Sequence, residues 1–212
     1  MILDPSLTAA YVVLAAALAL SPGPDVLFVV ANGMQNRSRG AIAAALGIGA
    51  GSVVHALAAA IGVSALIAAS PLAFDLLRYG GAAYLAYLGI RALIQCYRWE
   101  KPSDSSTTNA VDTTAGRVFL RGLITNILNP KVVVFYLALL PQFVNTDLGR
   151  VGLQIFLLGS IHNLIGLVFL LSIGMAAGRT SDWVARTSAG RWLDGIAGVF
   201  FIGLALRLLV SG

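Results

Sequence analysis

Long apolar segments with almost no charge are the feature that most constrains how this chain can fold. A helix needs about 20 apolar residues to cross the hydrocarbon core of a bilayer. Six segments reach or approach that length, at about residues 7–31, 41–69, 76–94, 118–143, 151–178 and 192–210. We therefore predict an all-α integral membrane protein with six transmembrane helices.

The composition argues against soluble alternatives. Hydrophobic residues make up 58% of the 212 residues and charged residues only 11%, whereas soluble domains carry about 25% charged residues. So little charge leaves too few polar side chains to cover a surface that faces water. The net charge of +5 comes from basic residues that lie mostly between the apolar segments, and we expect no nucleic-acid partner. The single cysteine, Cys96, excludes an intramolecular disulfide.

We expect one transmembrane domain, residues 1–212, with an internal division. Residues 97–116 form the only clearly polar stretch, rich in Ser, Thr and Asp, and predict a cytoplasmic linker. The linker separates repeat one, about residues 5–95, from repeat two, about residues 117–210, with three spans in each. The sequence contains no phosphate-binding GxxxxGK[ST] motif, so we expect that no ATPase within this chain drives transport.

The basic residues predict an orientation, because cytoplasmic loops of membrane proteins are enriched in Lys and Arg. The loops after the first, third and fifth spans hold ten Lys and Arg residues at or near them, and the opposite side holds three. This bias places the odd-numbered loops in the cytoplasm and both termini outside.

The first span is interrupted by the motif Ser21-Pro22-Gly23-Pro24-Asp25. Each proline removes a backbone donor and clashes with the preceding turn, and in a membrane the freed carbonyls need partners inside the protein or in a wet cavity. We predict a broken helix that restarts near Pro24 and points its first amides into the bundle. The simpler alternative is a proline kink that serves packing alone.

The fourth span contains a second motif, Asn126-Ile127-Leu128-Asn129-Pro130-Lys131. Asn129 is suited to cap a new half-helix, and Pro130 suits its first position. A charged residue deep in a span costs about 2.5–3.5 kcal/mol on insertion scales, which favours a functional or paired Lys131. The alternative is that Lys131 reaches the interface from a shallower position.

The two motifs precede similar stretches of sequence. Each proline comes before a charged residue and an apolar run, and then a histidine: His55 lies 31 residues after Pro24, and His162 lies 32 residues after Pro130. Each half has three spans, which is an odd number, so the two copies of the repeated unit enter the membrane from opposite sides. We therefore predict two inverted three-helix repeats with helices 1 and 4 broken at the proline motifs, as in secondary transporters.

Each histidine has two interpretations. One is proton relay or hydrogen bonding to a substrate near a cavity, and the other is a neutral histidine packed between helices. Both stay open for His55, and packing is favoured for His162. Their spacing with Asp25 matches no recognised zinc pattern, so we expect neither a metal site nor a cofactor.

Glycine-rich faces at residues 47–51 and 174–178 suit close packing between helices. The sequence leaves open whether the partner helix belongs to the same chain or to a second subunit of a homodimer.

Together the motifs resemble those of a known family. Residues 21–25 resemble its Pro-Gly-Pro segment, residues 45–55 its second-span motif, residues 80–90 its third-span motif and residues 129–131 its fourth. On these motifs, and over nearly its whole length, the chain resembles the LysE/RhtB amino-acid exporters of bacteria. Asp25 departs from the family pattern, in which Asn or Gln often follows the Pro-Gly-Pro segment.

The resemblance implies a multi-pass protein of the bacterial cytoplasmic (inner) membrane that exports amino acids or close derivatives, driven by the proton gradient, and that is not an enzyme. The expected partners are a small-molecule amino-acid substrate, the proton and the lipid bilayer. The candidate substrate-binding or coupling residues are Pro22, Gly23, Pro24, Asp25, His55, Asn126, Asn129, Pro130, Lys131 and His162.

Roles for the two charges stay open at this point. Asp25 is suited to hold a substrate ammonium or to carry the coupled proton, and Lys131 is suited to bind a carboxylate; alternatively, the two pair structurally. We expect both to face one central cavity. Two other classes of protein also stay open: an exporter of metal or inorganic ions with the same architecture, and an intramembrane enzyme.

Overall fold

The computed structural model describes residues 2–21, 23–97 and 114–177, together with seven residues between 195 and 206. Within these residues every regular element is a helix, as the sequence predicts for an all-α membrane protein. Most of the predicted linker and of the sixth span lies outside the described residues. The residues described there are all helical: Gly195, Gly198, Val199, Ile202, Gly203, Ala205 and Leu206.

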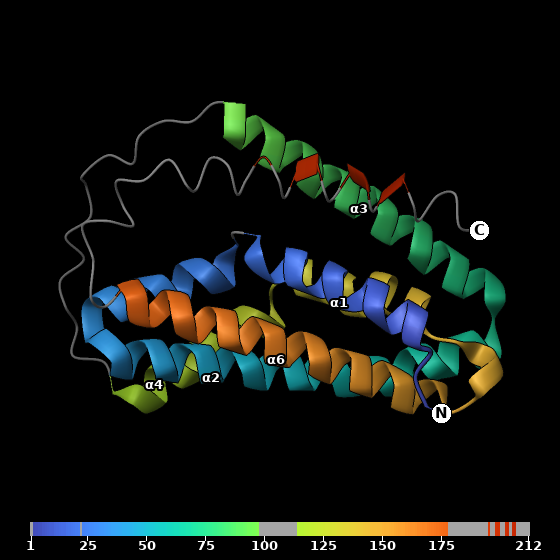
Figure 1. The fold of residues 1–212 in the computed structure, drawn as a ribbon, viewed down its shortest axis with the longest axis horizontal. Coiled ribbons are helices and arrows are strands. Elements are labelled where there is room, and N and C mark those ends of the chain that lie inside the picture. Colours follow the sequence, from blue (N-terminus) through green and yellow to red (C-terminus); the bar gives the residue numbers. More distant parts are fainter. Residues whose placement is uncertain are drawn as a thin grey trace.

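The first proline motif divides the chain between α1 (Pro5–Leu20) and α2 (Pro24–Ala69). The Asp4 side chain caps the start of α1 by accepting from the amides of Ser6 and Leu7. The backbones of Ser21 and Gly23 are extended, and Pro24 occupies the start of α2, where its missing N–H costs no helical bond. The predicted break is therefore present (Figure 1).

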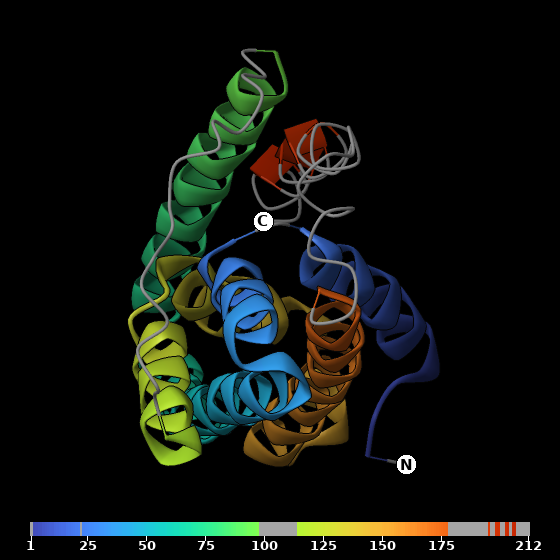
Figure 2. The same cartoon turned by 90° about the vertical axis from the view of Figure 1, so that its left-hand side faces the viewer.

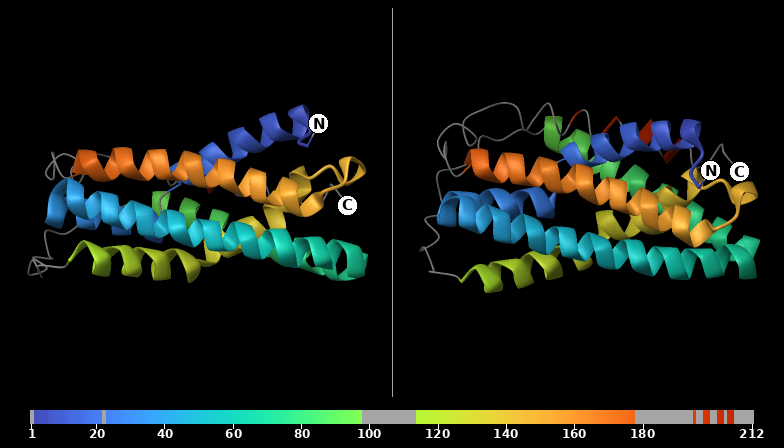
Figure 3. Two further views of the ribbon diagram at one scale, coloured as in Figure 1. Left: turned by 90° about the horizontal axis from the view of Figure 1, so that it is seen from below. Right: turned by 60° about the horizontal axis from the view of Figure 1, so that its bottom comes forward.

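The helix α2 contains a second interruption, where Asn36 and Arg37 leave the helical conformation and Arg37 adopts a positive φ of 51°. Residues eight apart in a straight helix lie about 12 Å from each other along the axis. Here a Cβ on Gly40 would overlap the carbonyl oxygen of Asn32. The chain therefore folds back at Arg37, so that α2 consists of a short arm and a long arm (Figure 3).

The second proline motif separates α4 (Ala115–Ile127) from α5 (Pro130–Val134). After α5 the chain continues as a π-helical turn, η1 (Phe135–Leu139), and a 3-10 turn, η2 (Leu140–Phe143). Pro141 within η2 explains the irregularity, because it lacks the amide that a regular α-helix would need there. A further 3-10 turn, η3 (Thr146–Leu148), leads to α6 (Val151–Ala177).

The main bundle is built around the long arm of α2, which packs along both α4 and α6. Close approach to α4 requires glycine, because a Cβ on Gly47 would overlap the carbonyl oxygen of Phe119. The long helix α3 (Pro71–Tyr97) contacts η1 and α2, and Figures 1 and 2 show its C-terminal end diverging from the bundle.

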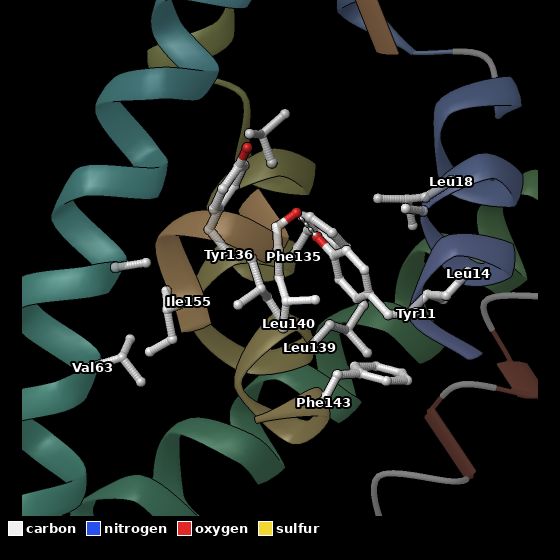
Figure 4. Packing of buried hydrophobic residues seen from close by; sticks show 14 of the residues in the cluster. Tyr11, Leu14, Leu18, Val63, Phe135, Tyr136, Leu139, Leu140, Phe143 and Ile155 are labelled. Atoms are coloured by element: carbon white, nitrogen blue, oxygen red, sulfur yellow. Dashed lines mark hydrogen bonds between the residues drawn. The ribbon is translucent and has the colours of Figure 1, made fainter. Parts of the chain in front are cut away.

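The interior of the bundle holds two separate clusters of buried hydrophobic residues. The larger is rich in aromatic residues and joins α1 to η1, η2 and α6; Figure 4 shows Tyr11, Phe135, Tyr136 and Phe143 within it. The Tyr11 hydroxyl donates to the Leu158 carbonyl at 2.9 Å. The smaller cluster joins both arms of α2 to α4 and α6, through Val29, Ile48, Val118 and Leu170 among others.

Two described segments are long and apolar enough to cross a membrane, Pro24–Leu66 and Val151–Ala177, and the pair Ala115–Ile127 with Pro130–Phe143, bent by 51°, would make a third. Because α2 folds back at Arg37, only its long arm is straight enough to be the crossing part of the first segment. The described residues thus support an apolar helical membrane protein. The six-span arrangement and the inverted repeat stay predictions.

Candidate functional site

The two helix breaks meet at one cavity, which has a volume of about 60 Å³ and therefore room for several water molecules. It lies between the two buried clusters, since Leu18 and Val132 of the larger cluster and Ile48 and Leu170 of the smaller one all line it. Its polar lining residues are Ser21, Asp25, Ser52, Asn126, Asn129, Lys131, His162 and Asn163.

The ammonium of Lys131 reaches from the second break to the first. It donates to the backbone carbonyls of Leu18 at 3.1 Å and Ser21 at 3.0 Å. Both lie at the end of α1, where the regular i to i+4 bonds stop and the Leu18 carbonyl accepts only from the Ser21 amide, at 3.3 Å, within the described backbone. A cation at a helix C-terminus is also favoured by the helix dipole. Lys131 therefore stabilises the interrupted end of α1.

Asp25 lies in the first turn of α2, where the helix dipole favours a carboxylate. Its Oδ2 accepts from the side-chain amide of Asn126 at 2.8 Å. Its Oδ1 is buried and has no hydrogen-bond partner among the described residues. A buried acceptor without a donor is unfavourable, so this oxygen is available to a proton or to a donor group of a ligand.

Asn126 connects Asp25 to the long arm of α2. Its side chain is buried, and its Oδ1 lies 3.5 Å from the Ser52 hydroxyl. Its backbone carbonyl lies 3.2 Å from Nε2 of His55. A Cβ on Gly51 would come within 2.6 Å of Oδ1 of Asn126, so glycine at that position makes the room that Asn126 occupies.

The second break has the local structure that the sequence predicts. The Asn129 side chain accepts from the Lys131 amide at 3.1 Å and caps α5, and Pro130 begins the helix. Because the cap holds the first turn of α5 at the cavity, it also positions the start of the Lys131 side chain.

The two histidines have different surroundings. His55 contacts Asn126 and stacks on Tyr136, with ring centroids 5.7 Å apart, and does not line the cavity. His162 lines the cavity, is 9% exposed and packs against Phe135, with 4.1 Å between ring centroids. Its Nδ1 has no hydrogen-bond partner among the residues that the structure describes.

The structure thus brings most of the sequence-predicted residues together. Six line the cavity: Gly23, Asp25, Asn126, Asn129, Lys131 and His162. Pro24 and Pro130 start the half-helices beside it, His55 lies behind Asn126, and Pro22 lies outside the described residues.

Three polar lining residues are not among the predicted site residues: Ser21, which belongs to the first proline motif, and Ser52 and Asn163, which the sequence analysis missed. Ser52 and Asn163 each had a detectable signal, because each is a polar residue in an apolar segment, close in sequence to a predicted histidine. Sequence reasoning also missed the backbone partners of Lys131, which no side-chain pattern encodes. Among the described residues, no three His, Cys, Asp or Glu side chains gather where they could hold a metal ion.

Comparison with known proteins decides the family. The chain matches the LysE type translocators over residues 16–212. It belongs to this family. Membership makes it a transport protein of a membrane.

Two relatives cover nearly the whole of this LysE translocator. The leucine efflux protein of Salmonella typhimurium is 29% identical over 199 residues, which are 93% of this chain and 92% of the relative. The uncharacterized membrane protein YrhP of Bacillus subtilis is 27% identical over 206 residues, 95% of this chain and 98% of the relative. No solved structure matches the chain.

Proposed function

We propose that the chain is a proton-coupled secondary exporter of amino acids across the bacterial cytoplasmic membrane. We further propose that it binds its substrate in the cavity between the broken helices. The observation that carries the proposal is the meeting of Asp25 and Lys131, from two separate helix breaks, at one cavity. The efflux of leucine named for relatives in Salmonella supports an amino-acid substrate.

The charges suit the two ends of an amino acid. A zwitterion brings an ammonium and a carboxylate, and each needs a partner where water is scarce. The unpartnered Oδ1 of Asp25 can accept from the ammonium. The Lys131 ammonium, now bonded to the carbonyls of Leu18 and Ser21, can attract the carboxylate.

Proton coupling is explained by the same carboxylate. Asp25 is the acidic residue that lines the cavity, and when protonated it no longer offers a charge to the substrate ammonium. A proton and a substrate would thus compete for Asp25, which is the linkage that an antiporter requires. Substrate would leave as a proton enters from outside.

The architecture that we propose is the one the sequence predicts: six transmembrane helices in two inverted three-helix repeats, with both termini outside. The corresponding positions of Pro24 and Pro130 at the starts of two half-helices support it. Broken helices at matching positions place a site near the middle of the membrane in other secondary transporters.

The test uses purified protein in liposomes loaded with labelled leucine. We expect an imposed proton gradient to accelerate leucine efflux by the parental protein, and Asp25→Asn to lose most of that acceleration. Equal amounts of inserted protein, checked by immunoblotting, make the comparison valid. The same gradient response in Asp25→Asn would refute the coupling role, and absence of amino-acid efflux from parental liposomes would refute the proposed function.

A further inference from the structure

The residues of α6 that line the cavity change from polar to apolar along the helix. One face of this helix presents His162 and Asn163, then Gly166, and then Leu167 and Leu170. Residues four apart on a helix share a face, so position 166 lies between His162 and Leu170. Position 166 is therefore the boundary between a polar and an apolar part of the wall.

The long arm of α2 forms the opposite wall of the cavity, and its lining residues change from polar to apolar in the same direction as those of α6. It runs antiparallel to α6: a Cβ on Gly159 would contact Ala56, one on Gly49 would contact Leu167, and one on Gly174 would contact Ala41. Ser52 therefore lies toward His162, and Ile48 lies toward Leu167 and Leu170. Along these two walls the lining is polar at one end and aliphatic at the other.

Gly166 leaves open space at this boundary. Within the part of the chain that the structure describes, a Cβ built there would meet no atom within 4 Å, although the residue lines the cavity. On the facing wall a Cβ on Gly49 would lie 3.5 Å from Oδ1 of Asn163 and 3.6 Å from Cδ1 of Leu167, which is ordinary contact. Both positions can therefore take a methyl group that reduces the cavity without displacing the helices.

Two buried polar atoms that lack hydrogen-bond partners within the described residues support the binding of a ligand in this cavity. Nδ1 of His162 and Oδ1 of Asp25 have no hydrogen-bond partner in the described parts of the chain, and both residues line the cavity. Unpaired buried polar atoms are rare in folded proteins and are explained by a missing partner such as a ligand or water.

We propose that Gly166 determines specificity, by leaving room for the side chain of an aliphatic amino acid of about the size of leucine. The inference rests on the proposed function, with the substrate's charged groups at Asp25 and Lys131. The side chain then extends past Gly166 toward Leu167, Leu170 and Ile48. Asp25 and Lys131 are the charged residues among the described lining, so a substrate with a charged side chain lacks a partner in the aliphatic part.

The experiment compares efflux of labelled leucine and labelled alanine from liposomes that hold the parental protein, Gly166→Ala or Gly166→Val. A pocket that loses room for one or two methyl groups discriminates by about tenfold or more. We expect Gly166→Val to lower the ratio of leucine to alanine efflux by about tenfold, with alanine efflux within about twofold of the parental rate. Gly166→Ala should lower the ratio by a smaller factor.

The experiment includes a control variant outside the cavity and a second variant on the opposite wall of the cavity. Gly62 lies exposed on α2 outside the cavity lining, and a Cβ there also meets no described atom within 4 Å. We therefore expect Gly62→Val to leave the ratio unchanged. Gly49→Ala reduces the cavity from the opposite side and should lower the ratio as Gly166→Ala does. If Gly166→Val does not insert, the two alanine variants decide the test.

Two outcomes would overturn the inference, and they differ from each other. An unchanged ratio in Gly166→Ala and Gly49→Ala, with normal leucine efflux by the parental protein, refutes the specificity role and leaves the proposed function intact. Absence of both leucine and alanine efflux from parental liposomes refutes the proposed function and this inference with it.

Discussion

At the scale of single residues, each of the two charges in the cavity has a partner from another part of the chain. Asp25 accepts from Asn126, and Lys131 donates to the carbonyls of Leu18 and Ser21. Removing either charge therefore leaves the other with hydrogen-bond partners, so that the cost of an isolated buried charge is reduced. This arrangement favours roles in binding and coupling over a purely structural ion pair.

A cycle of neutral variants separates these roles. We expect Asp25→Asn and Lys131→Ala each to lower leucine efflux by at least about tenfold, the factor that 1.4 kcal/mol of lost interaction produces. If the residues bind substrate and protons, the double variant will be no more active than the worse single variant. Recovery of most of the efflux in the double variant would instead identify a structural pair. Melting temperatures in detergent control for unfolding.

At the scale of elements, the two proline motifs act as helix starts. Pro24 and Pro130 begin α2 and α5 directly after an interruption, and a proline at that position prevents the preceding helix from continuing through it. Alanine restores the amide and has the highest helix propensity, so it weakens the interruption.

We expect Pro24→Ala and Pro130→Ala each to impair efflux more than they impair insertion, because the altered break displaces the cavity while the apolar segments are unchanged. Efflux per inserted molecule, from liposomes and immunoblots, measures the effect. Efflux at the parental rate in both variants would show that the breaks serve packing alone.

The start of α1 gives a prediction about pH. Hydrogen bonds from the Ser6 hydroxyl, the Leu7 amide and the Asn145 side chain hold the pKa of Asp4 at about 2, below its ordinary 3.8. Because the folded state lowers this pKa, the stabilisation is present above about pH 4 and is lost as the pH falls through about 2.

Asp4→Ala should therefore lower the melting temperature at pH 5, and the difference from the parental protein should shrink as the pH approaches 2. Thermal unfolding of both proteins in detergent across this range measures it. A difference that does not change with pH would mean that the Asp4 charge contributes nothing to the cap.

The sequence predicts the helix breaks, because proline and charged residues indicate them, but it does not predict contacts that depend on tertiary packing. The breaks at residues 21–24 and 128–130 arise from proline chemistry and are present. The sequence does not predict the π-helical turn at Phe135–Leu139, although Pro141 is a visible signal. The contact of Lys131 with α1 depends on backbone carbonyls brought together by packing, and no spacing of residue types encodes such a contact.

At the scale of the whole molecule, the ends of the bundle differ in charge. The reversal at Arg37 and the start of α4 lie at one end, and the N-terminus lies at the other (Figure 1). Asn145 donates to Asp4 at 3.2 Å, which places the turns before α6 at the same end as the N-terminus. Arg37 and Arg39 lie at the reversal of α2, and Arg117 and Arg121 lie in the first half of α4, so the positive-inside rule predicts that this end is cytoplasmic.

Cysteine labelling tests this orientation independently of the C-terminal segment. Arg37 lies at the reversal of α2 and Asp147 lies in η3, and both are exposed. The reversal and the turns before α6 lie at opposite ends of the bundle (Figure 1), and Cys96→Ser removes the native thiol. We expect a membrane-impermeant maleimide added outside intact spheroplasts to label Asp147→Cys, and to label Arg37→Cys only after the membrane is opened.

A reporter that is active only in the cytoplasm should be silent when fused to the C-terminus, if six spans place both termini outside. Labelling of Arg37→Cys in sealed spheroplasts would reverse the topology, whereas an active C-terminal reporter with the expected labelling would indicate an odd number of spans.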